Sequence, residues 1–152
     1  MAAEPTTGPP DFVGVGTQRS GTTWWFKTLL GHPQIRPPRG RRKELHFFDR
    51  FCARELLDAD VAEYHELFPR KPGQITGEWT PRYMHDFWTP RLLARAAPEA
   101  KLLIMFRDPV ERYRSGVLHQ GQRTPYRDAA WLATDAISVL FPTPGPEKIP
   151  MR

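Results

Sequence analysis

The 152-residue sequence contains a single cysteine, Cys52, and no long apolar run. One cysteine allows no internal disulfide, which excludes the disulfide-rich scaffolds and indicates a reducing compartment, with the thiol acting as a small buried or half-buried hydrophobic group. No segment approaches the about 18 apolar residues of a membrane span. Residues 1–10, MAAEPTTGPP, have neither a basic start nor an apolar centre, so we expect no secretory signal. These absences predict a cytoplasmic protein without a membrane span.

Positive charge and proline are abundant instead. The formal net charge is +5 and the pI is about 9.7, which indicates an anionic partner without defining its kind. A chain of this length is sufficient for one domain with a single core. We expect a disordered lead over residues 1–10, one domain over 11–141 and an irregular tail over 142–152.

The stretch FVGVGTQRSGTTWWFKTLL, residues 12–30, predicts a strand, a glycine-rich turn and a helix in that order. Such an order makes an anion-binding cradle, because loop N–H groups and the helix N-terminus point at the same place. Gly16 and Gly21 have the spacing of a P-loop, but Thr22 stands where a nucleoside triphosphatase carries lysine. The cation is Arg19, inside the loop. The hydroxyl donors of the loop are Ser20, Thr22 and Thr23. We predict a site for a phosphate or sulfate ester other than a magnesium nucleoside triphosphate, with an ordinary glycine turn as the plain alternative.

Alternating strand and helix patterns continue along the chain. Further strands are predicted over residues 74–79 and 101–106, the latter, KLLIMF, as a continuously apolar strand buried in a parallel sheet. Asp60 is expected to cap a helix, and most of the bulky helix start at residues 24–26 is expected to contact the core or the sheet. The predicted helices after the first cover residues 60–68, 89–97, 109–120 and 129–141. This alternation predicts an α/β fold, a parallel sheet flanked by helices, with ligands at the carboxyl ends of the strands.

The apolar run KLLIMF ends at a second strand-to-helix junction, RDPVE. Asp108 is expected to cap the helix, Pro109 to take its first position and Glu111 to close a capping box. A cation, Arg107, lies at the mouth of this junction, and Ser115 follows about two turns along the helix. Two anion-binding junctions on one sheet edge suit a ligand with two separated anionic groups.

The segment KELHFFD, residues 43–49, contains the candidate catalytic groups. If the segment is extended, Glu44 and His46 project from one face, and the aromatic neighbours favour a carboxylate that acts as a general base. An ordinary surface glutamate is the plain alternative for Glu44. His46 is the second candidate base, because an imidazole titrates nearer neutrality. Partner ligands at metal-site spacing are missing from the sequence around His46, so we expect no metal.

A basic loop, RPPRGRRK over residues 36–43, precedes these groups. Three interpretations stay open for it: a nucleic-acid-binding patch, a solvated loop, or a rim that draws an acidic substrate toward the neighbouring site.

Four segments in the same order, GTQRSGTTWW, KELHFFD, GEWTPRY and RDPVERYRSG, resemble the sulfotransferases that use 3′-phosphoadenosine 5′-phosphosulfate, in particular bacterial members and heparan-type carbohydrate enzymes. The resemblance covers about residues 12–120 and implies a P-loop-like sulfotransferase fold whose cosubstrate is this nucleotide, with no metal. It implies that the 5′-phosphosulfate is bound by Arg19, Ser20, Gly21, Thr22 and Thr23. It also implies that Arg107 and Ser115 hold the 3′-phosphate and that Glu44 is the catalytic base. The matched positions near the acceptor and cosubstrate are Glu78 and Tyr83.

Two departures from the family pattern stand out. At the position of Trp79, heparan-type enzymes often have lysine. They also often have lysine at the position of Arg19, whereas arginine is common there in bacterial members. Family members also continue well past this length, so the resemblance implies the N-terminal portion of a sulfotransferase, truncated at the C-terminus, with an incomplete nucleotide-binding domain over 11–141. The implied function is sulfuryl transfer to a hydroxyl or amine of a small-molecule or carbohydrate acceptor. An anionic acceptor is one of the acceptors that the resemblance allows.

Two other functions require features that this sequence does not show. A P-loop kinase or nucleoside triphosphatase needs a lysine where Thr22 stands. A basic nucleic-acid-binding module built on residues 36–43 needs a recognition helix or a stacking surface, which the sequence does not indicate. We therefore expect no nucleic-acid partner.

Overall fold

The computed structural model describes residues 4–123. They form two compact units that divide between Phe106 and Arg107. The strands are β1 (Phe12–Gly16), β2 (Ile35–Arg36), β3 (Ile75–Trp79) and β4 (Lys101–Ile104). The α-helices are α1 (Thr22–Leu30), α2 (Asp58–His65), α3 (Thr89–Ala96) and α4 (Pro109–Arg123). Short 3₁₀ helices are η1 (Arg39–Arg41), η2 (Phe47–Phe51) and η3 (Pro81–Met84). The helix predicted over 129–141 and the tail over 142–152 lie outside the described residues.

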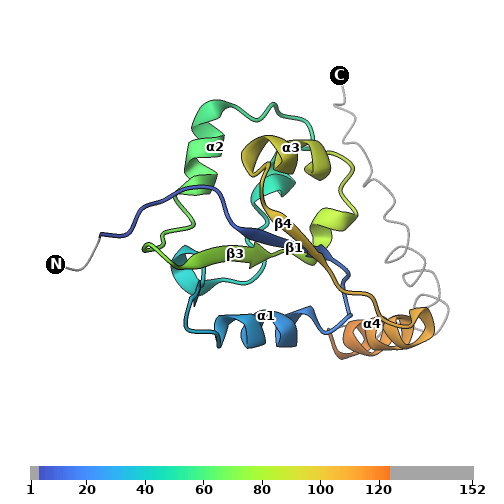
Figure 1. The fold of residues 1–152 in the computed structure, drawn as a ribbon. Helices are drawn as coiled ribbons and strands as arrows, with labels where there is room; N and C mark the ends of the chain where they lie inside the picture. Colours follow the sequence, from blue (N-terminus) through green and yellow to red (C-terminus); the bar gives the residue numbers. More distant parts are fainter. Residues whose placement is uncertain (1–3, 124–152) are drawn as a thin grey trace, which may run out of the picture. The chain divides into compact units, whose positions relative to one another are not determined.

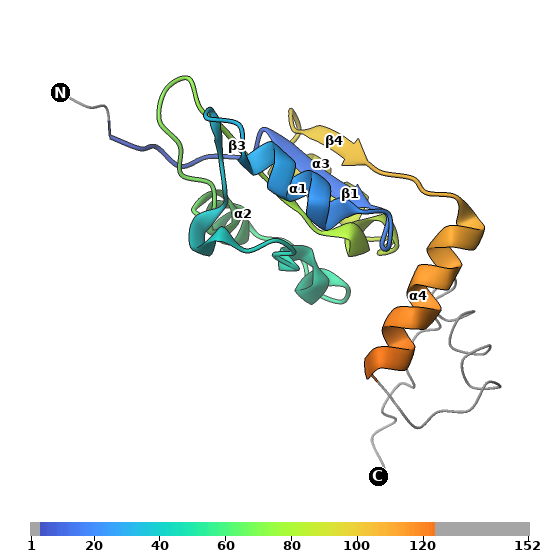
Figure 2. The ribbon, with the colours of Figure 1, turned by 90° about the horizontal axis from the view of Figure 1, so that it is seen from below.

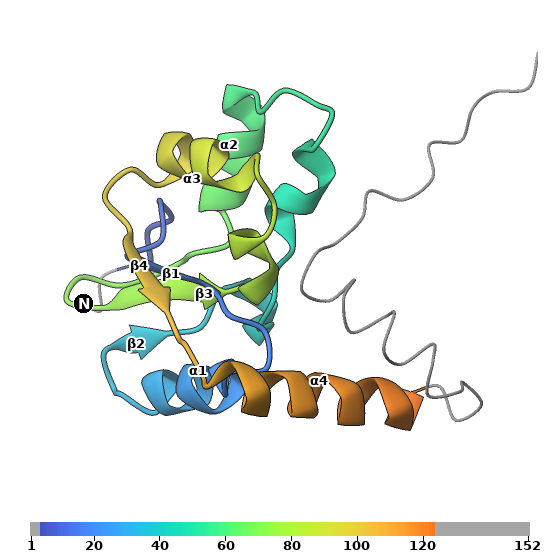
Figure 3. The ribbon, with the colours of Figure 1, turned by 90° about the vertical axis from the view of Figure 1, so that its right-hand side faces the viewer.

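The first unit is built on a parallel sheet with the strand order β2-β3-β1-β4. Helix α1 lies on one face of the sheet, and α2 and α3 lie on the other (Figure 1). Seen from below, α1 runs in front of β1 (Figure 2), and the side view again places the strands between α1 and the pair α2 and α3 (Figure 3). Because the strands are parallel, their carboxyl ends share one edge, where the loop after β1 and the turn after β3 both begin. The predicted α/β class is confirmed.

Strand β1 forms the centre of the core. All five of its residues are buried, and alternate side chains point to opposite faces of the sheet. Phe12 packs with Phe26 of α1 and Trp79 of β3 on one face. Val13 and Val15 contribute to the larger cluster on the other face, which is completed by aromatic and aliphatic side chains of η2, α2 and α3. One strand therefore connects both layers of helices.

Two glycines allow the close approach of neighbouring strands. A Cβ atom added at Gly14 would lie 2.1 Å from Cδ2 of Trp79, and one added at Gly77 would lie 2.2 Å from the carbonyl oxygen of Phe12. The Trp79 indole fills the space that Gly14 leaves open and is buried. Trp79, which replaces the lysine of the heparan-type pattern, is therefore a core side chain.

The prediction for the start of α1 was wrong for two of three residues. Trp24 and Trp25 are 63% and 41% exposed, whereas Phe26 is buried. Successive helical residues lie about 100° apart, so three bulky neighbours cannot all face one sheet. The composition of a segment does not show which of its members face inward.

The expected burial of the fourth strand was also wrong. Among the described residues β4 pairs with β1 alone and lies at the edge of the sheet. Leu102 and Ile104 are exposed, and the adjoining Phe106 is 71% exposed. An apolar run predicts a strand, but its burial depends on what covers the sheet beyond it.

Two further expectations need correction. Helix α2 begins two residues earlier than predicted, and the Asp60 carboxylate accepts the N–H of Leu57, 2.8 Å away, from the third helical position rather than as the N-cap. The helix ends at His65 instead of residue 68. Cys52 is exposed rather than buried.

The second unit begins with α4 as predicted. The Asp108 carboxylate accepts the N–H of Glu111 at 3.0 Å, and Pro109 takes the first helical position. Between residues 4 and 123, no helix has the length and apolar character needed to cross a membrane.

Candidate active site

The loop after β1 holds its shape through contacts with the segment after β4. The Thr17 N–H and the Thr17 hydroxyl both donate to the carbonyl of Met105 at 2.9 Å, and the Met105 N–H donates to the carbonyl of Gly16 at 3.0 Å. The hydroxyls of Thr17 and Ser20 are hydrogen-bonded to each other. Arg19 and Gly21 have the left-handed φ angles of 65° and 80° that turn the chain into α1.

The N-terminus of α1 has the features of an anion site. No side chain caps it and its first turn contains no acidic residue. The amides of Thr22 and Thr23 occupy the first turn of α1, where N–H groups have no acceptor within the helix, and the helix dipole adds positive potential. Ser20 and Thr22 are buried, Arg19 is half-buried, and Gly21 and Thr23 are exposed. The sequence-predicted loop residues are therefore together around one helix end, although the Ser20 hydroxyl is engaged with Thr17.

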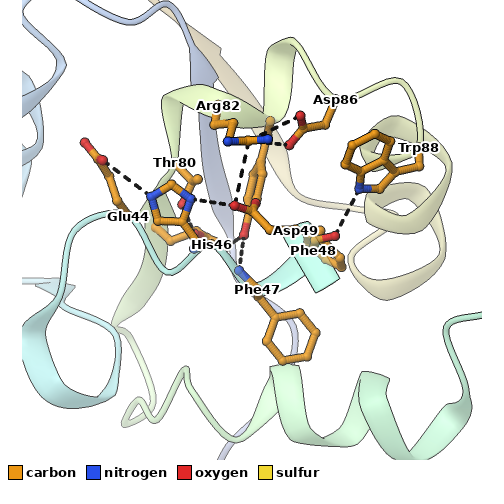
Figure 4. Close-up of polar contacts among 11 residues, drawn as sticks. Glu44, His46, Phe47, Phe48, Asp49, Thr80, Arg82, Asp86 and Trp88 are labelled. Carbon is orange, nitrogen blue, oxygen red and sulfur yellow. Dashed lines mark hydrogen bonds and ion pairs between the residues drawn. The ribbon is translucent and has the colours of Figure 1, made fainter. Parts of the chain in front are cut away.

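The segment 43–49 is not extended, contrary to prediction. Glu44 and His46 have φ angles of 63° and 53°, and η2 begins directly after His46. Their side chains still meet, because the left-handed turn brings His46 Nε2 to 3.6 Å from Glu44 Oε2 (Figure 4). Phe47 and Phe48 are buried in the core, whereas the Glu44 side chain is 43% exposed, so Glu44 is not buried among its aromatic neighbours as expected.

Charged residues that were not predicted surround this pair. Lys43 Nζ contacts Glu44 Oε1, and His46 Nδ1 lies 3.0 Å from Asp49 Oδ2. The Nε atom of Arg82 lies 3.8 Å from the same Asp49 oxygen and 3.2 Å from Asp86 Oδ2 (Figure 4). Asp49 could have been identified from the sequence, because it lies three residues after His46 in KELHFFD. No feature of the sequence near Arg82 indicated that this residue approaches the turn.

Burial affects Asp86, the third carboxylate of this network. Asp86 is buried, which raises its pKa, and the neighbouring Arg82 opposes that rise. The site thus alternates acidic and basic groups from Lys43 to Asp86.

A fourth carboxylate, Glu78, lies in the interior of the first unit. It is fully buried on β3 and accepts hydrogen bonds from the hydroxyls of Tyr64 at 2.7 Å, Thr80 at 2.7 Å and Tyr83 at 3.4 Å. Burial raises the pKa of Glu78 to about 6. Burial and the adjacent Glu78 also raise the pKa values of Tyr64 and Tyr83, so both phenols stay neutral.

Strand pairing brings the loop and the turn to the same sheet edge. The Thr80 N–H donates to the carbonyl of Gly14 at 2.9 Å, and the Glu44 N–H donates to the carbonyl of Trp79 at 3.0 Å. Glu44 is therefore attached to the end of β3, next to the end of β1 from which the Arg19 loop starts.

Arg107 and Ser115 belong to the second unit. Arg107 precedes α4 and its Nη2 atom lies 3.4 Å from Glu111 Oε2. Ser115 is half-buried on α4. Their role toward a 3′-phosphate stays a prediction. Between residues 4 and 123, no group of three or more His, Cys, Asp or Glu side chains is arranged to hold a metal ion.

Comparison with solved structures identifies the fold. A sulfotransferase from Alicyclobacillus acidocaldarius superposes with a TM-score of 0.66 at 24% identity, over 86% of this chain and 57% of that one. The fold is thus the α/β fold of sulfotransferases. No protein-family model matches the chain.

Sequence comparison then identifies relatives of the chain. Heparan sulfate glucosamine 3-O-sulfotransferase 6 of Homo sapiens is 36% identical over 117 residues, which are 76% of this chain and 32% of that protein. Membrane-associated sulfotransferase kil1 of Dictyostelium discoideum is 35% identical over 105 residues, 68% of this chain and 21% of that protein. Over the matched residues the chain is a homologue of these sulfotransferases, and it spans about a third or less of the length of these curated relatives.

Proposed function

We propose that this protein is a sulfotransferase that moves a sulfuryl group from 3′-phosphoadenosine 5′-phosphosulfate to a hydroxyl or amine of a carbohydrate. The observation that carries the proposal is a single sheet edge at which an uncapped helix N-terminus and the Arg19 loop adjoin the Glu44–His46 pair. Homology with sulfotransferases over the matched residues supports it.

The proposed chemistry needs positioning and charge stabilisation. Sulfuryl transfer is expected to resemble phosphoryl transfer through a loose transition state. The protein then contributes mainly by positioning the reactants and stabilising charge, and forms no covalent bond to them. Arg19 and the N–H groups at the start of α1 stabilise the charge that develops on the leaving phosphate. Arg107 and Ser115 bind the 3′-phosphate of the same nucleotide.

A base completes the reaction by taking the proton from the acceptor. In our proposal Glu44 has this role, and His46 orients the Glu44 carboxylate while Asp49 holds the other imidazole nitrogen. The alternating charges around the pair keep both side chains in one place.

We also propose an anionic carbohydrate as the acceptor. The names of several matched relatives specify heparan sulfate. The exposed residues Arg36, Arg39 and Arg42 lead along the chain into Lys43 and Glu44, and such a basic segment raises the local concentration of an acidic substrate.

Nucleotide binding tests the proposal. Because the loop has Arg19 and no P-loop lysine, we expect calorimetry to show adenosine 3′,5′-bisphosphate bound without magnesium and in preference to ATP. Arg19→Ala should weaken this binding by about 1.5–3 kcal/mol, the contribution of a charge-assisted hydrogen bond. Preference for ATP, or an absolute need for magnesium, would favour the kinase alternative and overturn the proposal.

A further inference from the structure

We infer that Glu78 is a positioning residue that fixes the turn carrying Glu44 and His46. This inference rests on the proposed function, because it assigns Glu78 a role in presenting the proposed base. Glu78 itself is fully buried, as are Thr80 and Tyr83, so these side chains act through the turn and do not contact a substrate.

The Glu78 carboxylate organises three donors that lead to the turn. Its Oε2 atom accepts the Thr80 hydroxyl and its Oε1 atom accepts the Tyr83 hydroxyl. The backbone N–H of Leu45 donates to the carboxylate directly. Since burial raises the pKa of Glu78 only to about 6, the group is ionised at neutral pH and can accept from all of them.

Each hydroxyl then accepts one backbone N–H of the turn. The His46 N–H donates to Thr80 Oγ1 at 3.5 Å, and the Phe47 N–H donates to Tyr83 Oη at 2.9 Å. With the Leu45 N–H, three consecutive amides are connected to one buried carboxylate. The preceding amide, that of Glu44, donates to the carbonyl of Trp79, the residue after Glu78.

This set of contacts matches a backbone that needs support. Glu44 and His46 both have left-handed φ angles, a conformation that is unfavourable for residues with a side chain. It is also the conformation in which their side chains meet. A buried carboxylate is costly to retain for stability alone, because an apolar group can often replace it without loss. The hydrogen bonds that connect the Glu78 carboxylate to residues 45–47 explain why a charged side chain is retained at this buried position.

Tyr64 provides a matched control for this chain of contacts. Its hydroxyl is as buried as that of Tyr83 and donates to the same Oε1 atom at 2.7 Å. None of the hydrogen bonds described for residues 4–123 connects it to an amide of the turn. Tyr64→Phe therefore removes a comparable buried hydrogen bond without touching the support of residues 45–47.

The test compares Tyr83→Phe and Thr80→Val with Tyr64→Phe in the full chain. Hydrogen exchange followed by NMR should show the Phe47 amide exchanging about tenfold faster in Tyr83→Phe, and the His46 amide faster in Thr80→Val, as the loss of one hydrogen bond implies. Tyr64→Phe should leave both rates near those of the parent. Sulfate transfer should follow the same order, with kcat reduced about tenfold in Tyr83→Phe and Thr80→Val at unchanged nucleotide affinity.

The outcomes separate this inference from the function it rests on. If Tyr64→Phe accelerates exchange at the two amides as much as the other variants do, Glu78 is only part of the core and the inference fails. If exchange responds as expected but the parent chain neither binds adenosine 3′,5′-bisphosphate nor transfers sulfate, the support of the turn stands and the proposed function fails. If the His46 and Phe47 amides exchange faster in Thr80→Val and Tyr83→Phe but kcat is unchanged, the positioning role of Glu78 is also overturned.

Discussion

His46 is the side chain on which the arrangement of the site depends most directly. One of its nitrogens faces Glu44 and the other faces Asp49, so the imidazole connects two carboxylates that belong to different parts of the turn. The Glu44 carboxylate is shared between His46 and Lys43. Under the proposed function, Glu44 and His46 are therefore the two candidates for the base that takes a proton from the acceptor.

Side-by-side variants distinguish these two bases. We expect Glu44→Gln to leave nucleotide affinity nearly unchanged and to reduce sulfate transfer by about 10²–10⁴-fold, the usual contribution of a positioned general base. His46→Ala should reduce transfer less, because it removes the partner that orients Glu44. The measurements are calorimetry with adenosine 3′,5′-bisphosphate and steady-state transfer to a carbohydrate acceptor. Full turnover in Glu44→Gln combined with loss in His46→Ala would transfer the role of base to His46.

Single residues also show which features of the site can be predicted from the sequence. The proximity of Glu44 and His46 was predicted, but from an extended backbone that the segment does not have. The left-handed turn could not be predicted, because neither residue is glycine and the contacts that support it come from residues 78–83. Arg82 and Asp86 were missed for the same reason, since they approach the turn only through the fold.

At the level of elements, strands and helices were predicted best where local chemistry defines their ends. Proline at the start of α4 and the apolar residues of β1 were sufficient to predict these two elements. The two-residue strand β2 was missed, since so short a segment has no periodicity to detect. The edge position of β4 depends on its neighbours in space, which its own sequence does not encode.

Helix α4 allows the proposed recognition of the 3′-phosphate to be tested. We expect Arg107→Ala and Ser115→Ala to weaken binding of adenosine 3′,5′-bisphosphate more than binding of its 3′-dephospho analogue. Each charge-assisted hydrogen bond to the phosphate should contribute about 1.5–3 kcal/mol, measured by calorimetry with both nucleotides.

Arg114→Ala is the control on the same helix. Arg114 Nη1 lies 3.1 Å from Glu111 Oε1, so its removal perturbs the same carboxylate that Arg107 contacts. Equal losses for the two nucleotides in Arg107→Ala would assign Arg107 to the structure of the helix start instead of to the phosphate.

For the whole molecule, the buried charge of Glu78 links folding to pH. Its pKa is about 6 in the folded protein and 4.5 when it is exposed. Because the folded state holds the proton more tightly, the contribution of Glu78 to stability is fully present below pH 4.5 and is lost as the pH rises through 6. Tyr64 and Tyr83 do not add to this dependence, since their raised pKa values keep them neutral.

Urea unfolding of the parent chain and of Glu78→Gln at pH 4 and pH 7.5 tests this linkage. The free energy of unfolding of the parent, taken relative to Glu78→Gln, should fall by about 2 kcal/mol between the two pH values, at about 1.36 kcal/mol per pKa unit. Glu99→Gln, which changes an exposed glutamate, should show no such difference. A parent chain that gains stability relative to Glu78→Gln as the pH rises would show that hydrogen bonds to Glu78 outweigh its burial, and its pKa would then lie below 4.5 in the folded state.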